Sequence, residues 1–128
     1  MATEKNTANK EWMTAYKLMR LGKDGKVYPL FINRKEPTRF GEVLEAEFLP
    51  RRGFQPRKGW HACFTPYAPH LKEELASGER RVWVEVKVKD WESYDRPARQ
   101  GGKWILAQNM IAVRVMDEKD VIEIRRAA

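Results

Sequence analysis

Apolar and polar residues alternate most regularly between Val82 and Val88, where four valines share one face of an extended chain. Strict alternation over this length is typical of a β-strand with one buried face. Trp83 falls on the other face with Glu85 and Lys87, so this indole is expected either to be covered by another layer or to be exposed. In the exposed case, Trp83 is a candidate anchor for a partner.

Five more segments alternate or form short apolar runs of strand length. They are residues 14–21, 27–32, 43–48, 60–64 and 104–116, the last forming one or two strands. In that last segment we expect Ile111, Val113 and Val115 to face inward. The Lys-Asp-Gly-Lys sequence at 23–26 has tight-turn chemistry and predicts that the first two of these strands form a hairpin. Pro29 predicts that the second strand lies at a sheet edge or contains a bulge.

Two helices are expected, at residues 68–77 and at 118–124. Pro69 suits the first turn of the earlier helix, and Asp117 is a suitable N-cap for the later one. Residues 90–103 contain a proline and two adjacent glycines, which predicts a mobile loop. Helices and strands do not alternate as βαβ units require. The sequence therefore predicts an α+β fold: a mainly antiparallel sheet of about six strands, one central helix and a short C-terminal helix.

A chain of 128 residues has the usual size of a single domain. Residues 1–12 lack periodicity, so we expect a disordered N-terminal arm followed by one domain at 13–128. No apolar run reaches the roughly 20 residues of a membrane span, and the start has no signal-peptide core. The single cysteine, Cys63, excludes an internal disulfide and is typical of reducing compartments. We therefore expect a cytoplasmic (intracellular) protein with no membrane partner.

Positive charge is concentrated in the first half of the chain. The net charge is +7, and residues 13–66 alone carry eleven basic and five acidic residues. Such a field attracts phosphates or an acidic protein. Cations interleaved with aromatic residues such as Phe54 suit phosphate contact combined with base stacking. The predicted contacts are cations of two expected loops: Arg51, Arg52, Arg57, Lys58, Arg96 and Arg99.

Both histidines and the cysteine lie within one short stretch, from His61 to His70. Cys63 beside His61 has the composition of a thiolate nucleophile with its base, and the three residues together are potential metal ligands. However, no orienting group and no fourth ligand stand at a recognisable spacing. We expect no metal and no cofactor, and we favour a binding protein over an enzyme. Tyr16, His61 and His70 remain candidate residues of a pocket.

Several short motifs resemble small uncharacterised proteins of phages and prophages. The motifs are AYKLMR at 15–20, PLFI at 29–32, GWH at 59–61, APH at 68–70 and GKW at 102–104. The likeness spans most of residues 13–116. It implies an accessory protein of a mobile element.

The order of segments is also similar to the core of ADP-ribosyltransferase-like domains. The shared features are a tyrosine strand, a Gly-Trp-His-Ala-x-x-Thr-Pro segment that runs into a helix, and the strand at 82–86. In that family a first-strand histidine or arginine holds NAD and a late glutamate directs the chemistry. Lys17 stands at the first of these positions here, and the chain has no Ser-Thr-Ser triplet. This resemblance implies a fold, and transfers no site residue.

The leading hypothesis is a non-enzymatic phage- or prophage-type accessory protein. It would bind nucleic acid, or a host complex that handles nucleic acid, through a basic face, with inhibition of a host defence system as one form of this role. The first alternative is a degenerate ADP-ribosyltransferase-like enzyme that uses NAD. The second is a module that self-associates through Trp83. The oligomeric state is left open by the sequence.

Overall fold

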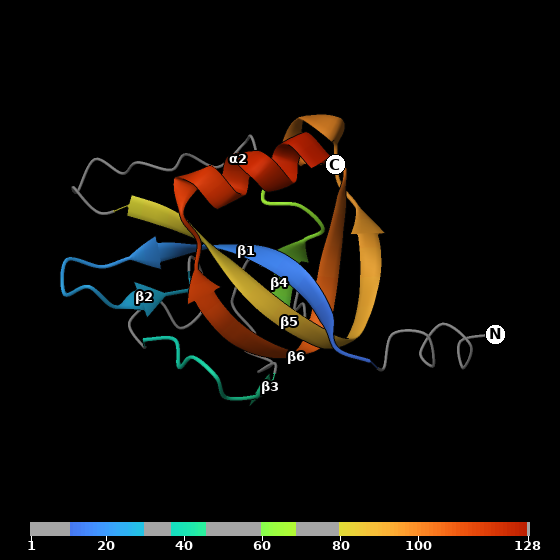
Figure 1. The fold of residues 1–128 in the computed structure, drawn as a ribbon. Coiled ribbons are helices and arrows are strands. Elements are labelled where there is room, and N and C mark those ends of the chain that lie inside the picture. Colours follow the sequence, from blue (N-terminus) through green and yellow to red (C-terminus); the bar gives the residue numbers. More distant parts are fainter. Residues whose placement is uncertain (1–10, 30–36, 46–59, 69–79, 128) are drawn as a thin grey trace, which may run out of the picture.

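A computed structural model describes residues 11–29, 37–45, 60–68 and 80–127. These residues form six strands, one α-helix and one short 3₁₀ turn (Figure 1). In chain order they are β1 (Met13–Leu21), β2 (Val27–Tyr28), β3 (Leu44–Glu45), β4 (Trp60–Cys63), β5 (Arg80–Asp95), the 3₁₀ turn η1 (Ala98–Gln100), β6 (Lys103–Val115) and α2 (Glu118–Ala127). The named strands all pair antiparallel. The predicted mainly antiparallel sheet with a C-terminal helix is therefore confirmed.

Three expectations fall outside the described residues. They are the arm at 1–12 apart from its last two residues, the central helix at 68–77 apart from Ala68, and the basic loop at 50–59.

The predicted first hairpin is confirmed. β1 and β2 pair antiparallel, with Leu21 opposite Val27. The turn between them contains Gly25 at a φ of 81°, a conformation that favours glycine because it has no Cβ. The Asp24 carboxylate accepts the backbone N–H of Lys26 at 3.0 Å and so closes the turn. Among the described strands β2 pairs only with β1, which places it at an edge.

Four of the strands close into a ring. β1 pairs with β5, β5 with β6, and β6 with β4. β4 then returns to β1, where Cys63 lies opposite Tyr16. β3 adds to β6 beside β4, and the strands curve around a common interior (Figure 1). The ring gives each strand one face toward this interior and one face outward.

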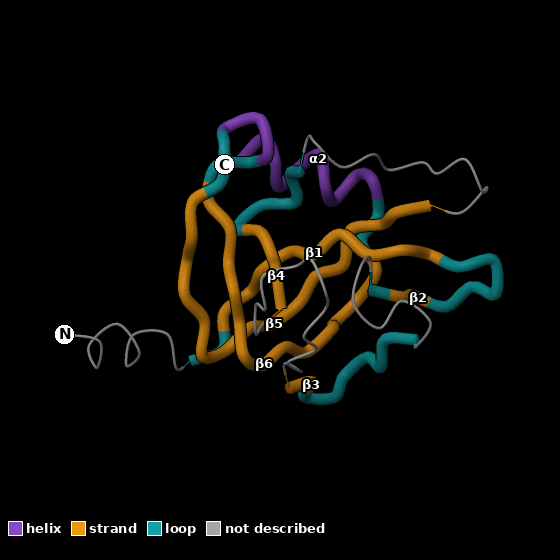
Figure 2. Tube along the Cα trace, turned by 180° about the vertical axis from the view of Figure 1, so that it is seen from behind, coloured by secondary structure: helices purple, strands orange, loops and turns teal. Residues whose placement is uncertain are grey.

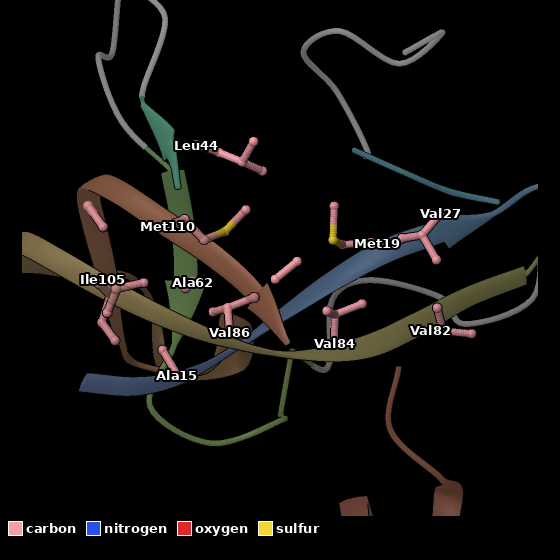
Figure 3. Close-up of a cluster of buried hydrophobic side chains, with 13 residues drawn as sticks. Ala15, Met19, Val27, Leu44, Ala62, Val82, Val84, Val86, Ile105 and Met110 are labelled. Carbon is pink, nitrogen blue, oxygen red and sulfur yellow. The ribbon is translucent and has the colours of Figure 1, made fainter. Parts of the chain in front are cut away.

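The interior contains a cluster of mainly aliphatic side chains that point toward one another from every strand of the ring (Figure 3). Its buried members are Ala15, Met19, Val27, Leu44, Ala62, Val82, Val84, Val86, Val88, Ile105, Ala107, Met110 and Ala112. The predicted burial of the valine face of β5 is thus confirmed. β-Branched residues suit this position because they pack well on a pleated surface.

The inward face changes in the middle of the β5–β6 hairpin. On β5 the interior residues are even-numbered up to Val88, and Trp91 is the next to pack against the cluster. Between them Asp90 has a φ of 54°, and Asn109 donates a hydrogen bond to its carboxylate at 2.9 Å. Asp tolerates this backbone region because its short polar side chain bonds locally. The change of face lies within the curved part of both strands (Figure 1).

β6 consequently buries residues other than those that alternation predicts. Val113 and Val115, expected inward with Ile111, are each 41% exposed, while Met110 and Ala112 are buried in the interior. For Ile111 and Val113 the prediction was wrong because the change of face shifts the buried positions by one residue, whereas Val115 lies opposite the interior residue Val84 and is exposed at the end of the strand. A register shift against β5 then adds one residue to β6, as in a β-bulge.

Residues 90–103 are ordered as a hairpin and not as the predicted mobile loop. β5 continues to Asp95, which pairs with Lys103 at the start of β6, so that only residues 96–102 connect the strands. The proline and the glycines of this segment all fall in the connection. The proline and glycines therefore indicated the connection correctly, but the predicted loop was too long because it included the ends of both strands.

A second cluster lies between the outer face of the ring and α2, which crosses one end of the strands (Figure 1). Its members are Leu18, Cys63, Ala68, Trp83, Trp104, Met116 and Val121. Arg114 of β6 adds polar contacts here, because it donates to Glu85 at 3.2 Å and to Asp120 of α2 at 2.9 Å. We call this set the outer cluster and the first one the interior cluster.

Candidate functional site

A concentration of cations among the described residues lies at one end of the molecule, where α2 ends. Two segments form it, the connection between β5 and β6 and the last turn of α2, whose C-terminal end lies beside η1 in both views (Figures 1 and 2). We call this region the basic end. Residues 95–103 and 124–127 carry five basic residues and one acidic residue, a net charge of +4. The cations are Arg96, Arg99, Lys103, Arg125 and Arg126.

Backbone hydrogen bonds hold the β5–β6 connection in a single shape. The N–H of Arg96 donates to the carbonyl of Gly102 at 2.6 Å, and that of Gln100 donates to Pro97 at 2.8 Å. Gly101 follows η1 at a φ of 103° and donates to Ala98 at 3.1 Å. These bonds position the exposed Arg99 on an ordered turn.

Arg96 is held against the outer cluster. Its guanidinium carbon lies 4.6 Å from the centroid of the Trp104 ring, and its Nε donates to Oε1 of Gln100 at 3.0 Å. The Trp104 indole N–H donates to the carbonyl of the same Gln100 at 2.7 Å, and the residue is only 7% exposed. A guanidinium over an indole face gains cation–π energy while its remaining N–H groups stay accessible. The buried Trp104 ring thus holds the Arg96 side chain in place at the basic end.

Arg125 connects α2 to the segment that follows β4. Its Nε donates to the carbonyl of Pro66 at 2.6 Å, and its guanidinium carbon lies 5.8 Å from the centroid of the Tyr67 ring. The carbonyl of Tyr67 lies 3.1 Å from where a Cβ on Gly101 would sit, so glycine permits this close approach. Tyr67 itself is 48% exposed. Three segments distant in the sequence therefore meet at the basic end.

The positive charge of this end is little neutralised. Lys103 and Asp95 form an ion pair at 3.7 Å between two largely exposed side chains, a kind of contact that contributes little. Arg99 and Arg126 form no ion pair with any residue in the described ranges. Arg125 and Arg126 also suit the C-terminus of α2, where the helix dipole favours cations.

The structure thus brings together two of the six predicted basic contacts, Arg96 and Arg99. The other four, Arg51, Arg52, Arg57 and Lys58, lie outside the described residues, as does Phe54. Sequence reasoning missed the two arginines of α2 because residues 104–128 carry four basic and four acidic residues, a neutral sum. The signal that could have found them is the separation of signs along the helix, acidic in its first turn and basic in its last. Tyr67 carried no such signal.

Trp83 is not an exposed partner anchor. It is 5% exposed within the outer cluster, and its carbonyl accepts the N–H of Met116 at 2.9 Å where β6 leads into α2. Of the two alternatives expected for this indole, the structure shows the covered one, because α2 forms the layer that packs over it. The Trp83 side chain is therefore not part of the surface of this structure.

The candidate pocket residues lie on the outer faces of β1 and β4. Nδ1 of His61 is 2.6 Å from Oη of Tyr94, and the two rings meet edge to face. Tyr16 packs against the outer cluster opposite Cys63, and burial, followed by the charge of Glu85, raises its pKa. His70 lies outside the described residues. Within those residues, no three His, Cys, Asp or Glu side chains come together as metal ligands would.

Two titratable groups of this region are strongly affected by burial. Burial raises the pKa of the Cys63 thiol to about 12, although the charges of Lys17 and Arg96 oppose this. Burial likewise lowers the pKa of Lys17 to about 8, against a smaller opposing effect of Cys63. The Lys17 ammonium donates to the carbonyl of His61 at 2.7 Å. At neutral pH Cys63 is therefore a thiol, which is the poorly nucleophilic form.

Helices in the described part of the chain are too short and too polar to cross a membrane. No family model matches the sequence, and neither the curated proteins nor the solved structures include a match.

Proposed function

We propose that the protein is a non-enzymatic accessory protein, of the phage or prophage kind that its motifs resemble, which binds nucleic acid through the basic end. It would act in the cytoplasm, where such a ligand is present. The observation that carries this proposal is the basic end itself: five cations from two distant segments, held on one end of the molecule.

The chemistry of these side chains favours phosphate as the ligand. Four of the five cations are arginines, whose planar fork matches phosphate oxygens in a bidentate way. The hydrogen bonds around Arg96 and Arg125 order these side chains before binding, which reduces the entropy lost on association. The Arg96–Trp104 and Arg125–Tyr67 contacts place both guanidinium groups over aromatic rings at the basic end.

The test is fluorescence anisotropy of labelled oligonucleotides with the full chain at 50 and 200 mM salt. If all five cations contact phosphates, counterion release predicts an affinity lower by about 100-fold for a single strand and by about 500-fold for a duplex at the higher salt. The double variant Arg99→Glu/Arg126→Glu is expected to bind at least about tenfold more weakly than the wild type at 50 mM salt.

The matched control is Lys23→Glu/Lys26→Glu in the β1–β2 turn. It changes the net charge by the same amount with exposed residues on the opposite side of the molecule (Figure 1). This control is expected to lower the affinity far less than the arginine variant. Equal losses in the two variants, or no binding at 50 mM salt, would contradict the proposal.

A further inference from the structure

An exposed aromatic ring stands among the cations of the basic end. Tyr67 is 48% exposed although the residues on both sides of it, Pro66 and Ala68, are buried. Its N–H donates to the carbonyl of Thr65 at 2.7 Å. The backbone is thus anchored while the ring is presented to solvent. An apolar ring on a fixed backbone needs little further ordering to bind a flat partner.

The surroundings of Tyr67 differ from those of the other exposed aromatic side chains. The Phe64 ring packs edge to face against Trp91 at 5.8 Å. Trp12 lies near Lys89, and Phe40 pairs with Ala112 of β6, both away from the basic end. Trp104 belongs to the basic end but is buried with Arg96 over its face. Among the described residues, Tyr67 is therefore the aromatic ring that is both exposed and adjacent to arginines of this end.

We propose that the basic end selects single-stranded nucleic acid and that Tyr67 is the platform on which one base stacks. This inference rests on the proposed function, because the cations supply the phosphate contacts. Bases of a duplex are stacked on one another and present only their edges, whereas an unpaired base offers its flat face to an aromatic side chain. The Arg125 guanidinium lies over the Tyr67 ring at 5.8 Å from its centroid, so a base would stack on the other face and Arg125 would contact the neighbouring phosphate.

Charge and stacking predict opposite preferences, which makes the inference testable. A duplex carries a higher density of phosphates than a single strand, so a surface that acts by charge alone binds duplex at least as tightly. A surface that also stacks a base gains affinity only for the single strand. The wild-type preference between a twelve-nucleotide oligothymidine and a twelve-base-pair duplex at equal salt therefore separates the two cases.

The decisive variant is Tyr67→Leu, which removes the aromatic ring and keeps a shorter apolar side chain. We expect its affinity for oligothymidine to fall about five- to 100-fold, the range for one stacked base, with little change for duplex. Tyr67→Phe retains the ring and is expected to retain binding. Phe64→Leu is the matched control in the same segment and is expected to bind like the wild type. Thermal denaturation of each variant checks that the fold is kept.

The outcomes separate this inference from the proposed function. Duplex bound as tightly as the single strand by the wild type, or a Tyr67→Leu variant that loses both ligands equally, would overturn the stacking role and leave the nucleic-acid proposal intact. No binding of either ligand at 50 mM salt would overturn both. The wild-type preference decides the question even if Tyr67→Leu fails to fold.

Discussion

The interior and outer clusters are both buried, yet they differ in chemistry. The interior cluster is built from aliphatic side chains that strands of the ring contribute. The outer cluster includes two tryptophans and a cysteine, and a helix covers it. The polar atoms of the outer cluster need partners, and one of its tryptophans holds Arg96 of the basic end. The interior cluster therefore holds the strands of the ring together. The outer cluster instead links this ring to the basic end, the surface proposed to bind nucleic acid.

The largest expected effect comes from the interior cluster. Ile105 is fully buried there, so Ile105→Ala leaves a cavity and should lower the free energy of unfolding by about 2–5 kcal/mol. Val113→Ala, on the same strand but 41% exposed, should change it by less than about 0.5 kcal/mol. Urea denaturation measures both. Similar losses for the two variants would mean that β6 buries the residues that simple alternation predicts.

A smaller effect is expected at the one cation on an inward face of β1. Lys17 shares its face with Ala15 and Met19, and its pKa is lowered to about 8. Because the unfolded chain then binds more protons, the stability of the wild type should rise between pH 8 and 10.5. Lys17→Met should be more stable than the wild type by about 2 kcal/mol at pH 7, and this advantage should shrink across that window.

Cys63 must be removed from this measurement because it acts in the opposite direction. Its pKa is raised to about 12, so the folded state retains the thiol proton and loses stability as the pH rises from 9 toward 12. Urea denaturation in a Cys63→Ala background therefore isolates Lys17. An advantage of Lys17→Met that stays constant from pH 7 to 10 would show that the lysine pKa is not lowered.

The smallest effect distinguishes two tryptophans of the outer cluster. The indole N–H of Trp104 donates to Gln100, whereas that of Trp83 is buried without a hydrogen-bond partner among the described residues. Trp104→Phe and Trp83→Phe remove the same part of the ring, so the Trp104 variant should lose about 1 kcal/mol more in the free energy of unfolding. Chemical denaturation of both variants provides the comparison. A larger loss at Trp83 would indicate that its N–H has an acceptor after all.

Much of the local structure was predictable from neighbouring residues. The valine face of β5, the first hairpin and α2 follow from alternation, turn residues and a helix start signal, all of which act over a few residues. The positions buried by the second half of β6 were not predictable. They depend on the change of face at Asp90 and Asn109, where the two strands interact across the hairpin. Two of the five cations of the candidate site, Arg96 and Arg99, were predicted from the sequence, without the arrangement that brings them to Arg125.

The sequence by itself determined the antiparallel strands, the excess of positive charge and the presence of arginines in the β5–β6 connection. Only the tertiary structure decided that the strands close into a ring, that α2 covers Trp83, and that Tyr67 and the last turn of α2 meet η1. The physical reason is one of range. Periodicity and turn chemistry are properties of adjacent residues, whereas the site is formed by segments about 30 to 60 residues apart that packing of the outer cluster brings together.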